Sequence, residues 1–314
     1  MNDRFIQPLE ALRDLLNSCT LCPRQCRVNR AGGETGFCCL SDRILMDCAM
    51  AHHGEEPPLS GIGGAGTIFF SSCNLRCRYC QNYQISHEVK GEVLTAEGLA
   101  RVMLDLQEQG CHNVEPVTPT PQLPGIVKAL GMARARGLTI PLVYNCGGYE
   151  SQNVIRLLDG LVDIYLPDFK YGIDEEGREL SEAQDYSRYA VDAIREMVRQ
   201  VGDGLETENG IARRGVLIRH LVLPGKLDNS MAVLDLIKQH ISLSVSLSLM
   251  SQYTPMPKVR NHPQLGRRLT RVEYERVIDY ALDLGFEDIF VQDVDERSCV
   301  PDFDSECPFQ WDES

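Results

Sequence analysis

Short apolar runs alternate with helical stretches from Gly66 almost to the end of the sequence. Seven runs have the composition of strands: GTIFFS, NVEPVT, PLVYNC, VDIYLPDFK, GVLIRHLVLP, SVSLSLMSQY and DIFVQDV. Between two of them apolar residues keep helical spacing, at Leu99, Val102, Met103 and Leu106. Thr270 and Glu273 form a capping box for a helix that ends at Gly285. This alternation predicts an α/β fold in which right-handed crossovers join parallel strands into an open sheet or a barrel.

Polar residues follow the predicted strands one after another. They are Cys73, Glu115, Thr118, Asn145, Asp168, Lys170, Arg219, His220, Gln252 and Tyr253. In parallel α/β folds, the residues that bind ligands collect at the carboxyl ends of the strands. We therefore expect a single cavity that residues from every strand line.

Three cysteines lie within ten residues, in CNLRCRYCQN directly after the first predicted strand. A structural zinc site needs four ligands, but this loop supplies three, Cys73, Cys77 and Cys80. Three thiolates can hold three irons of a cubane cluster and leave the fourth iron open for a small molecule. The alternatives are a zinc site completed by a distant cysteine, or three buried structural cysteines.

The spacing Cys73-x3-Cys77-x-Tyr79-Cys80 resembles that of the radical S-adenosylmethionine (SAM) enzymes. The resemblance implies a 4Fe–4S cluster on the three cysteines, SAM on the open iron, and a partial parallel (β/α)6-type barrel. It also implies reductive cleavage of SAM to a 5′-deoxyadenosyl radical that abstracts hydrogen. Tyr79 is the aromatic residue that this family favours before the third cysteine.

Further motifs resemble the pyruvate formate-lyase activating enzyme-like branch: YNCGGYE, DIYLPDFKY, RHLVLPG and MSQYTP. This likeness implies that Asn145 and Asp168 face the ribose and that Lys170 and Arg219 pair with the methionine carboxylate. The branch normally has Gly-Gly-Glu-Pro after the second strand, where this chain has CHNVEPVTPTP. Glu115 keeps the acidic part, and the remaining polar contacts are expected from Asn113, Thr118 and Thr120.

The substrate that this branch implies is a glycyl-radical protein, with flavodoxin or ferredoxin as electron donor. A small molecule or a peptide is the alternative substrate, because the second-strand motif is changed. Two further classes of function stay open. The protein could be an iron–sulfur electron carrier that does not cleave SAM, or an interaction protein with zinc at both cysteine sites.

A second group of cysteines precedes the predicted barrel, in CTLCPRQCRVNRAGGETGFCC. Cys19, Cys22, Cys26 and Cys38 form a closed set of four, for which Cys39 is an alternative fourth member. Such a set fits structural zinc or a second 4Fe–4S cluster. We therefore predict a Cys-rich, metal-binding appendage over residues 1–64 that is loop-rich from residue 19, a barrel over 65–295 and an irregular acidic tail over 296–314. AHHGEEPPLSG, residues 51–61, is either a polar linker or a loop over the cluster.

Composition excludes some classes of protein. The sequence has 314 residues, thirteen cysteines and a formal net charge of -14. The negative charge disfavours nucleic acid as a partner, because such binding depends on clustered Lys and Arg. The sequence contains neither a secretion signal nor an apolar run of membrane-spanning length, so we expect a cytoplasmic protein without a membrane partner whose cysteines stay reduced. Isolated cysteines such as Cys111, Cys146, Cys299 and Cys307 are expected to bind no metal.

Overall fold

The computed structural model of the chain describes residues 3–294, 300–305 and 308–309. In this part of the chain ten strands form one sheet: β1 (Ile44–His52), β2 (Ala65–Phe70), β3 (Glu92–Leu94), β4 (Val114–Val117), β5 (Val143–Cys146), β6 (Ile164–Pro167), β7 (Glu206–Glu208), β8 (Ile211–Leu221), β9 (Ser246–Met250) and β10 (Ile289–Val291). The helices are α1 (Asp3–Asp14), α2 (Pro57–Ser60), α3 (Tyr83–Ser86), α4 (Ala96–Glu108), α5 (Leu123–Ala135), α6 (Gln152–Leu157), α7 (Asp174–Ser181), α8 (Tyr186–Val201), α9 (Leu227–His240) and α10 (Arg271–Leu284), with short 3-10 turns η1 (Thr120–Gln122) and η2 (Pro257–Val259).

The sheet is open and mostly parallel. Its strand order is β10-β9-β8-β6-β5-β4-β2-β1-β3, and β7 pairs with β8 outside this path. The strands from β2 to β10 along this path are parallel to one another, whereas β1 is antiparallel to both β2 and β3. Six parallel strands from β2 to β9 alternate with helices, and the short β10 follows α10. The predicted α/β fold with a (β/α)6-type partial barrel is therefore confirmed.

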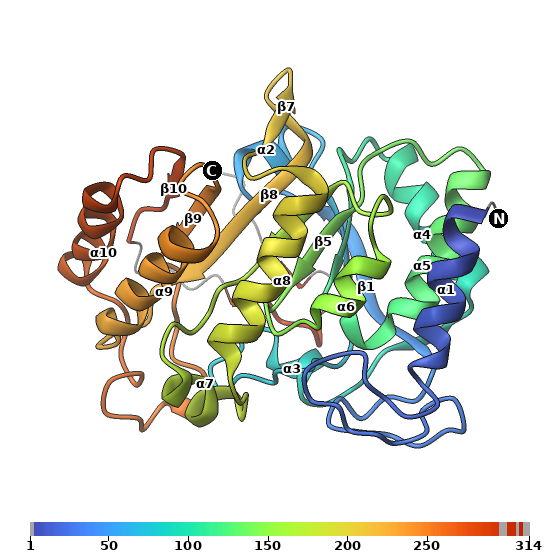
Figure 1. Cartoon of the computed structure of the whole chain (residues 1–314), viewed down its shortest axis with the longest axis horizontal. Helices are drawn as coiled ribbons and strands as arrows, with labels where there is room; N and C mark the ends of the chain where they lie inside the picture. The colour runs from blue at the N-terminus through green and yellow to red at the C-terminus, as the bar shows by residue number, and fades with distance from the viewer. Residues whose placement is uncertain (1–2, 295–299, 306–307, 310–314) are drawn as a thin grey trace.

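The longer helices form one continuous layer in the order α4, α5, α1, α6, α8, α9, α10. In Figure 1 the N-terminal helix α1 lies beside α5 and α6. Phe5, Leu9 and Leu12 of α1 are buried in the main core, so α1 closes the space between two helices of the barrel. The predicted capping box starts α10, and Gly285 ends it with a left-handed backbone (φ 97°). None of the described helices has the length and apolar character needed to cross a membrane.

The N-terminal part differs from the sequence expectation in one respect. Residues 19–64 were expected to be loop-rich, but β1 is a nine-residue strand whose backbone is hydrogen-bonded to β2 over most of its length. A period of two was visible at Ile44, Met46, Cys48 and Met50, yet the nearby cysteines made a loop the simpler interpretation. The expected boundary at residue 64 therefore falls between two paired strands. Most of the expected tail, residues 296–314, lies outside the described residues.

Candidate active site

One cavity lies at the carboxyl ends of the parallel strands. Its wall includes these residues of the predicted site: Cys73, Cys77, Tyr79, Cys80, Thr118, Asn145, Asp168, Lys170, Arg219 and Gln252. They come from the ends of β2, β4, β5, β6, β8 and β9, as the strand-end rule predicts. His220 and Tyr253 do not line this cavity, because their side chains are buried in the core.

Two of the three cysteines after β2 accept hydrogen bonds at their sulfur atoms. The backbone N–H of Leu75 donates to the Cys73 sulfur at 3.3 Å, and the Ser86 hydroxyl donates to the Cys80 sulfur at 3.3 Å. Burial raises the pKa of Cys73 to about 12 and that of Cys80 to about 11. Buried thiols of this kind are deprotonated when a metal replaces the proton, so the environment fits metal ligands.

The number of these thiols fits a cluster with an open iron. Cys73, Cys77 and Cys80 all line the one cavity. Three thiolates can hold three irons of a 4Fe–4S cubane and leave the fourth iron open, whereas a structural zinc site needs four ligands.

Lys170 and Asp168 form an ion pair beside the cysteines. The backbone fixes both residues, since Asp168 donates its N–H to Cys146 O at 2.8 Å and Lys170 donates its N–H to the Tyr186 hydroxyl at 2.9 Å. Burial alone would lower the pKa of Lys170, but the Asp168 carboxylate and the Cys77 thiol raise it above its ordinary value. Lys170 is therefore a fixed cation at the edge of the cluster site.

Arg219 has partners that the sequence did not predict. Its guanidinium forms ion pairs with Glu55 and Glu56, and its Nε lies 2.9 Å from Glu56 Oε1. Burial alone would raise the pKa of Glu56, but the guanidinium of Arg219 lowers it below its ordinary value. Arg219 was expected to be available for the methionine carboxylate. In this structure its ion pairs instead hold the loop of residues 51–61 against β8. Of the two interpretations of that loop, the structure favours the loop at the cavity, because its residues line the cavity wall.

The changed second-strand motif places its polar residues differently from the expectation. Glu115 is fully buried and does not line the cavity; it accepts a hydrogen bond from Asn145 Nδ2 at 2.8 Å. Burial and the nearby Glu55 carboxylate raise the pKa of Glu115 well above its ordinary value. Asn113 precedes β4, at the end away from the cavity, and donates to Leu59 O, so the structure places it outside the cavity where its contact with SAM was expected. Thr118 lines the cavity with a strained left-handed backbone, φ 56°.

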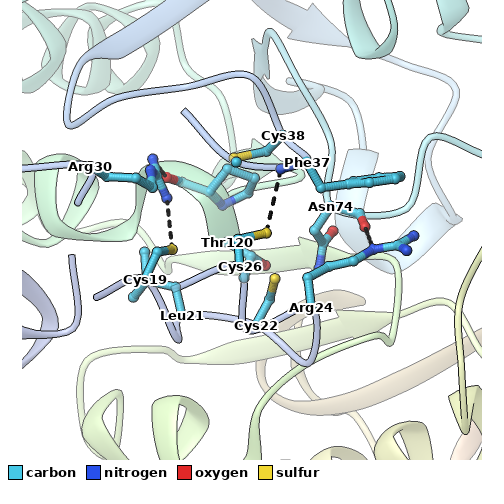
Figure 2. A pocket seen from close by; sticks show the side chains of 12 residues that line it. Cys19, Leu21, Cys22, Arg24, Cys26, Arg30, Phe37, Cys38, Asn74 and Thr120 are labelled. Atoms are coloured by element: carbon cyan, nitrogen blue, oxygen red, sulfur yellow. Dashed lines mark hydrogen bonds between the residues drawn. The ribbon is translucent and has the colours of Figure 1, made fainter. Parts of the chain in front are cut away.

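The N-terminal cysteines surround a second cavity. Cys19, Cys22, Cys26 and Cys38 all line it (Figure 2), and so does Thr120, which places Thr120 away from the first cavity. Cys38 lines this cavity with the other three cysteines, whereas Cys39 is exposed and lines neither cavity. Cys299 and Cys307 lie outside the described residues.

Sequence reasoning missed part of the cavity wall that comes from the C-terminal segment. Pro301 and Phe309 line the cavity, and the Phe309 ring lies 4.4 Å from the His52 ring. Gln84 donates from Nε2 to Asp302 at 2.9 Å, which ties this segment to α3. The isolated aromatic residues of CVPDFDSECPFQW were the available signal, but their acidic surroundings resembled a solvated tail.

Comparison with known proteins agrees with this geometry. An uncharacterized protein of Methanocaldococcus jannaschii is 31% identical over 293 residues, which cover 89% of this chain and 80% of the relative. A radical SAM methyltransferase from Sphaerobacter thermophilus has a similar structure, with a TM-score of 0.51 at 15% identity over 72% of this chain and 65% of its own, slightly less than two thirds. That likeness shows a shared fold alone. The model of the radical SAM superfamily matches residues 67–237, which begin within β2 and include the three cysteines and the strands β3 to β8. The chain belongs to the radical SAM superfamily.

Proposed function

We propose that this protein belongs to the pyruvate formate-lyase activating enzyme-like branch and cleaves SAM to abstract a hydrogen atom from a substrate. The observation that carries this proposal is that Cys73, Cys77 and Cys80 share one cavity with the Asp168–Lys170 pair. When bound, the 4Fe–4S cluster supplies the electron that splits SAM into methionine and a 5′-deoxyadenosyl radical. A protein that only carries electrons needs no polar cavity of this kind beside its cluster.

The residues of the cavity would act on SAM in distinct ways. The three cysteines would hold the cluster and leave one iron for the amino and carboxylate groups of SAM, and the Lys170 cation can pair with that carboxylate. Asp168 can accept from a ribose hydroxyl. The side-chain amide of Asn145 donates from Nδ2 to Glu115, so the Oδ1 of the same amide is left to accept from the ribose. The buried ring of Tyr79 on the cavity wall excludes water.

Glu115 and Arg219 are positioning residues in this proposal. Glu115 orients the Asn145 amide from behind the cavity wall, and Arg219 holds the loop that carries Glu55 and Glu56. Both act through another residue, so conservative replacement of either should change the affinity for SAM more than it changes the cluster content.

The substrate that we propose is the backbone glycine of a glycyl-radical protein, with reduced flavodoxin or ferredoxin as electron donor. The motifs shared with the activating enzymes support it. A small molecule or a short peptide is the second candidate. It is favoured because Pro301, Phe309 and the loop with Glu55 and Glu56 all line the cavity, which restricts the room for a loop of another protein.

The test is incubation of anaerobically reconstituted protein with SAM and a strong reductant, followed by chromatography for 5′-deoxyadenosine. Cys77→Ala should abolish this product. Cys39→Ser, which changes an exposed cysteine outside both cavities, should leave it unchanged. Absence of the product from wild-type protein with an intact, reducible cluster would refute the proposal.

The two substrate classes are separated in a second step. With a glycyl-radical protein present, an electron paramagnetic resonance signal of a glycyl radical should appear only when SAM and reductant are both added. Formation of 5′-deoxyadenosine without that signal, together with faster formation in the presence of a peptide or small molecule, would favour the second candidate.

A further inference from the structure

The second cavity is enclosed by sulfur and apolar atoms. Cys19, Cys22, Cys26 and Cys38 line it together with Leu21 and Phe37. Figure 2 shows the four cysteine side chains around this space. Cys19 is buried and the other three are partly buried. Four soft ligands therefore face one small cavity that is separate from the cavity of the barrel.

Two N–H groups point at these sulfurs. The backbone N–H of Phe37 donates to Cys26 Sγ at 3.4 Å, and Arg30 Nη1 lies 3.8 Å from Cys19 Sγ (Figure 2). Hydrogen bonds of this kind stabilise the negative charge of metal-bound thiolates. The cavity thus provides the surroundings of a metal centre as well as the ligands.

Arg30 is a buried cation that needs a negative partner. Arg30 is 2% exposed, and its guanidinium donates to the carbonyl oxygens of Leu40, Ser41 and Pro121. No carboxylate of the described residues forms an ion pair with Arg30. An uncompensated buried charge is strongly unfavourable, whereas a metal centre bound by four thiolates carries net negative charge.

We propose that Cys19, Cys22, Cys26 and Cys38 bind a second 4Fe–4S cluster, with one cysteine on each iron. The set contains no histidine, and the family of this chain binds a cluster at the adjoining triad of Cys73, Cys77 and Cys80. The closed set differs in that it leaves no iron for SAM.

This second site adjoins the loop of the first. Ser72, which precedes Cys73, donates its hydroxyl to Cys38 O at 2.5 Å. Asn74, which follows Cys73, lines the N-terminal cavity, and Arg24 Nε donates to its carbonyl oxygen at 2.9 Å. Residues 72–74 therefore form the wall between the two sites, and the N-terminal cluster would support the loop that holds the first.

The test measures metal content and does not depend on SAM cleavage, so it stands apart from the proposed activity. Full-length protein is reconstituted anaerobically with iron and sulfide. The content of iron, sulfide and zinc per chain is then measured, and the iron is examined by Mössbauer spectroscopy. Wild-type protein should hold about eight irons per chain. The Cys73→Ala/Cys77→Ala/Cys80→Ala variant should keep about four, with a cubane spectrum that SAM does not change.

The reciprocal variant Cys22→Ala/Cys26→Ala should keep about four irons whose spectrum SAM does change. Cys39→Ser is the matched control and should retain the wild-type content. The triad variant leaves the four N-terminal cysteines intact, so it decides the matter even if the reciprocal variant does not fold. Loss of all iron from the triad variant, or zinc in place of its iron, overturns the proposal.

Discussion

Replacing Arg219 with methionine would leave the carboxylates of Glu55 and Glu56 without their cation. The side chains of Arg219 and of both glutamates are about one-tenth exposed, so water compensates little for the loss. Removing one partner of a buried ion pair typically costs about 3–5 kcal/mol, because the charge that remains is uncompensated. We expect Arg219→Met to lower the free energy of unfolding by about that amount at pH 8.

The cost should depend on pH in a defined direction. Arg219 lowers the pKa of Glu56, so the stability from this pair is present above the ordinary carboxyl pKa of 4.5 and is lost as the pH falls below it. In the variant, burial without the guanidinium raises the pKa of Glu56, so its carboxyl takes up a proton more readily as the pH falls, which relieves its burial as a charge. The destabilisation should therefore be smaller at pH 5 than at pH 8.

The assay compares urea unfolding midpoints of anaerobic proteins that unfold with equal slopes. The triple variant Arg219→Met/Glu55→Gln/Glu56→Gln removes the unpaired charges and should recover at least about half of the loss. Arg213→Met, which breaks an exposed pair with Glu208, is the matched control and should change stability by less than about 0.5 kcal/mol. A cost below about 1 kcal/mol for Arg219→Met, or no recovery in the triple variant, would refute the reasoning.

Three further predictions concern buried groups near the site. Burial lowers the pKa of His220 to about 4, so the stability from its neutral ring is present above pH 6.5 and is lost as the pH falls toward 4; His220→Gln should remove a slope of up to about 1.4 kcal/mol per pH unit in urea titrations, and an unchanged slope contradicts this. Burial raises the pKa of Glu150 to about 8, so wild-type stability should fall between pH 4.5 and 8; Glu150→Gln should be more stable than wild type at pH 8, and equal stability there would count against the assignment. Gly148 has φ 76°, and an added Cβ would lie 2.2 Å from Asp168 O; Gly148→Ala should cost at least about 1 kcal/mol and weaken SAM binding in equilibrium dialysis, and wild-type values for both would show that the backbone can yield.

Local signals in the sequence were sufficient for the parallel part of the fold. GTIFFS is an apolar run that becomes β2, whose residues are all buried, and Thr270 and Glu273 form the predicted capping box. β1 was missed because its place depends on backbone hydrogen bonds to β2 and β3, which a single strand does not reveal. The strands β3 and β7 are three residues long, too short for a period of two to be recognised.

The site could be predicted only as far as chemistry depends on local spacing. The three cysteines lie in one loop, so their spacing carried the assignment without knowledge of the fold. The partners of Arg219 lie 163 and 164 residues away, and nothing near Arg219 identifies them. Asn113 was assigned to the cavity because it lies close to Glu115 in sequence, but it stands at the start of β4, away from the carboxyl end, and its side chain is bonded to Leu59 O.

The hydrogen bonds of Arg24 have a consequence for how the protein is made. Besides Asn74, its guanidinium binds the carbonyl oxygens of Ser181 and Glu182, and Glu182 is 158 residues further along the chain. At a synthesis rate of about 5–20 residues per second, the N-terminal cysteines leave the ribosome roughly 8–30 s before that partner exists. During this interval their thiols are exposed to oxidants and to competing metals. Loading of the metal centre that we propose at the N-terminal cysteines would therefore follow completion of the barrel, and protection of the nascent chain from oxygen should raise the yield of metallated protein.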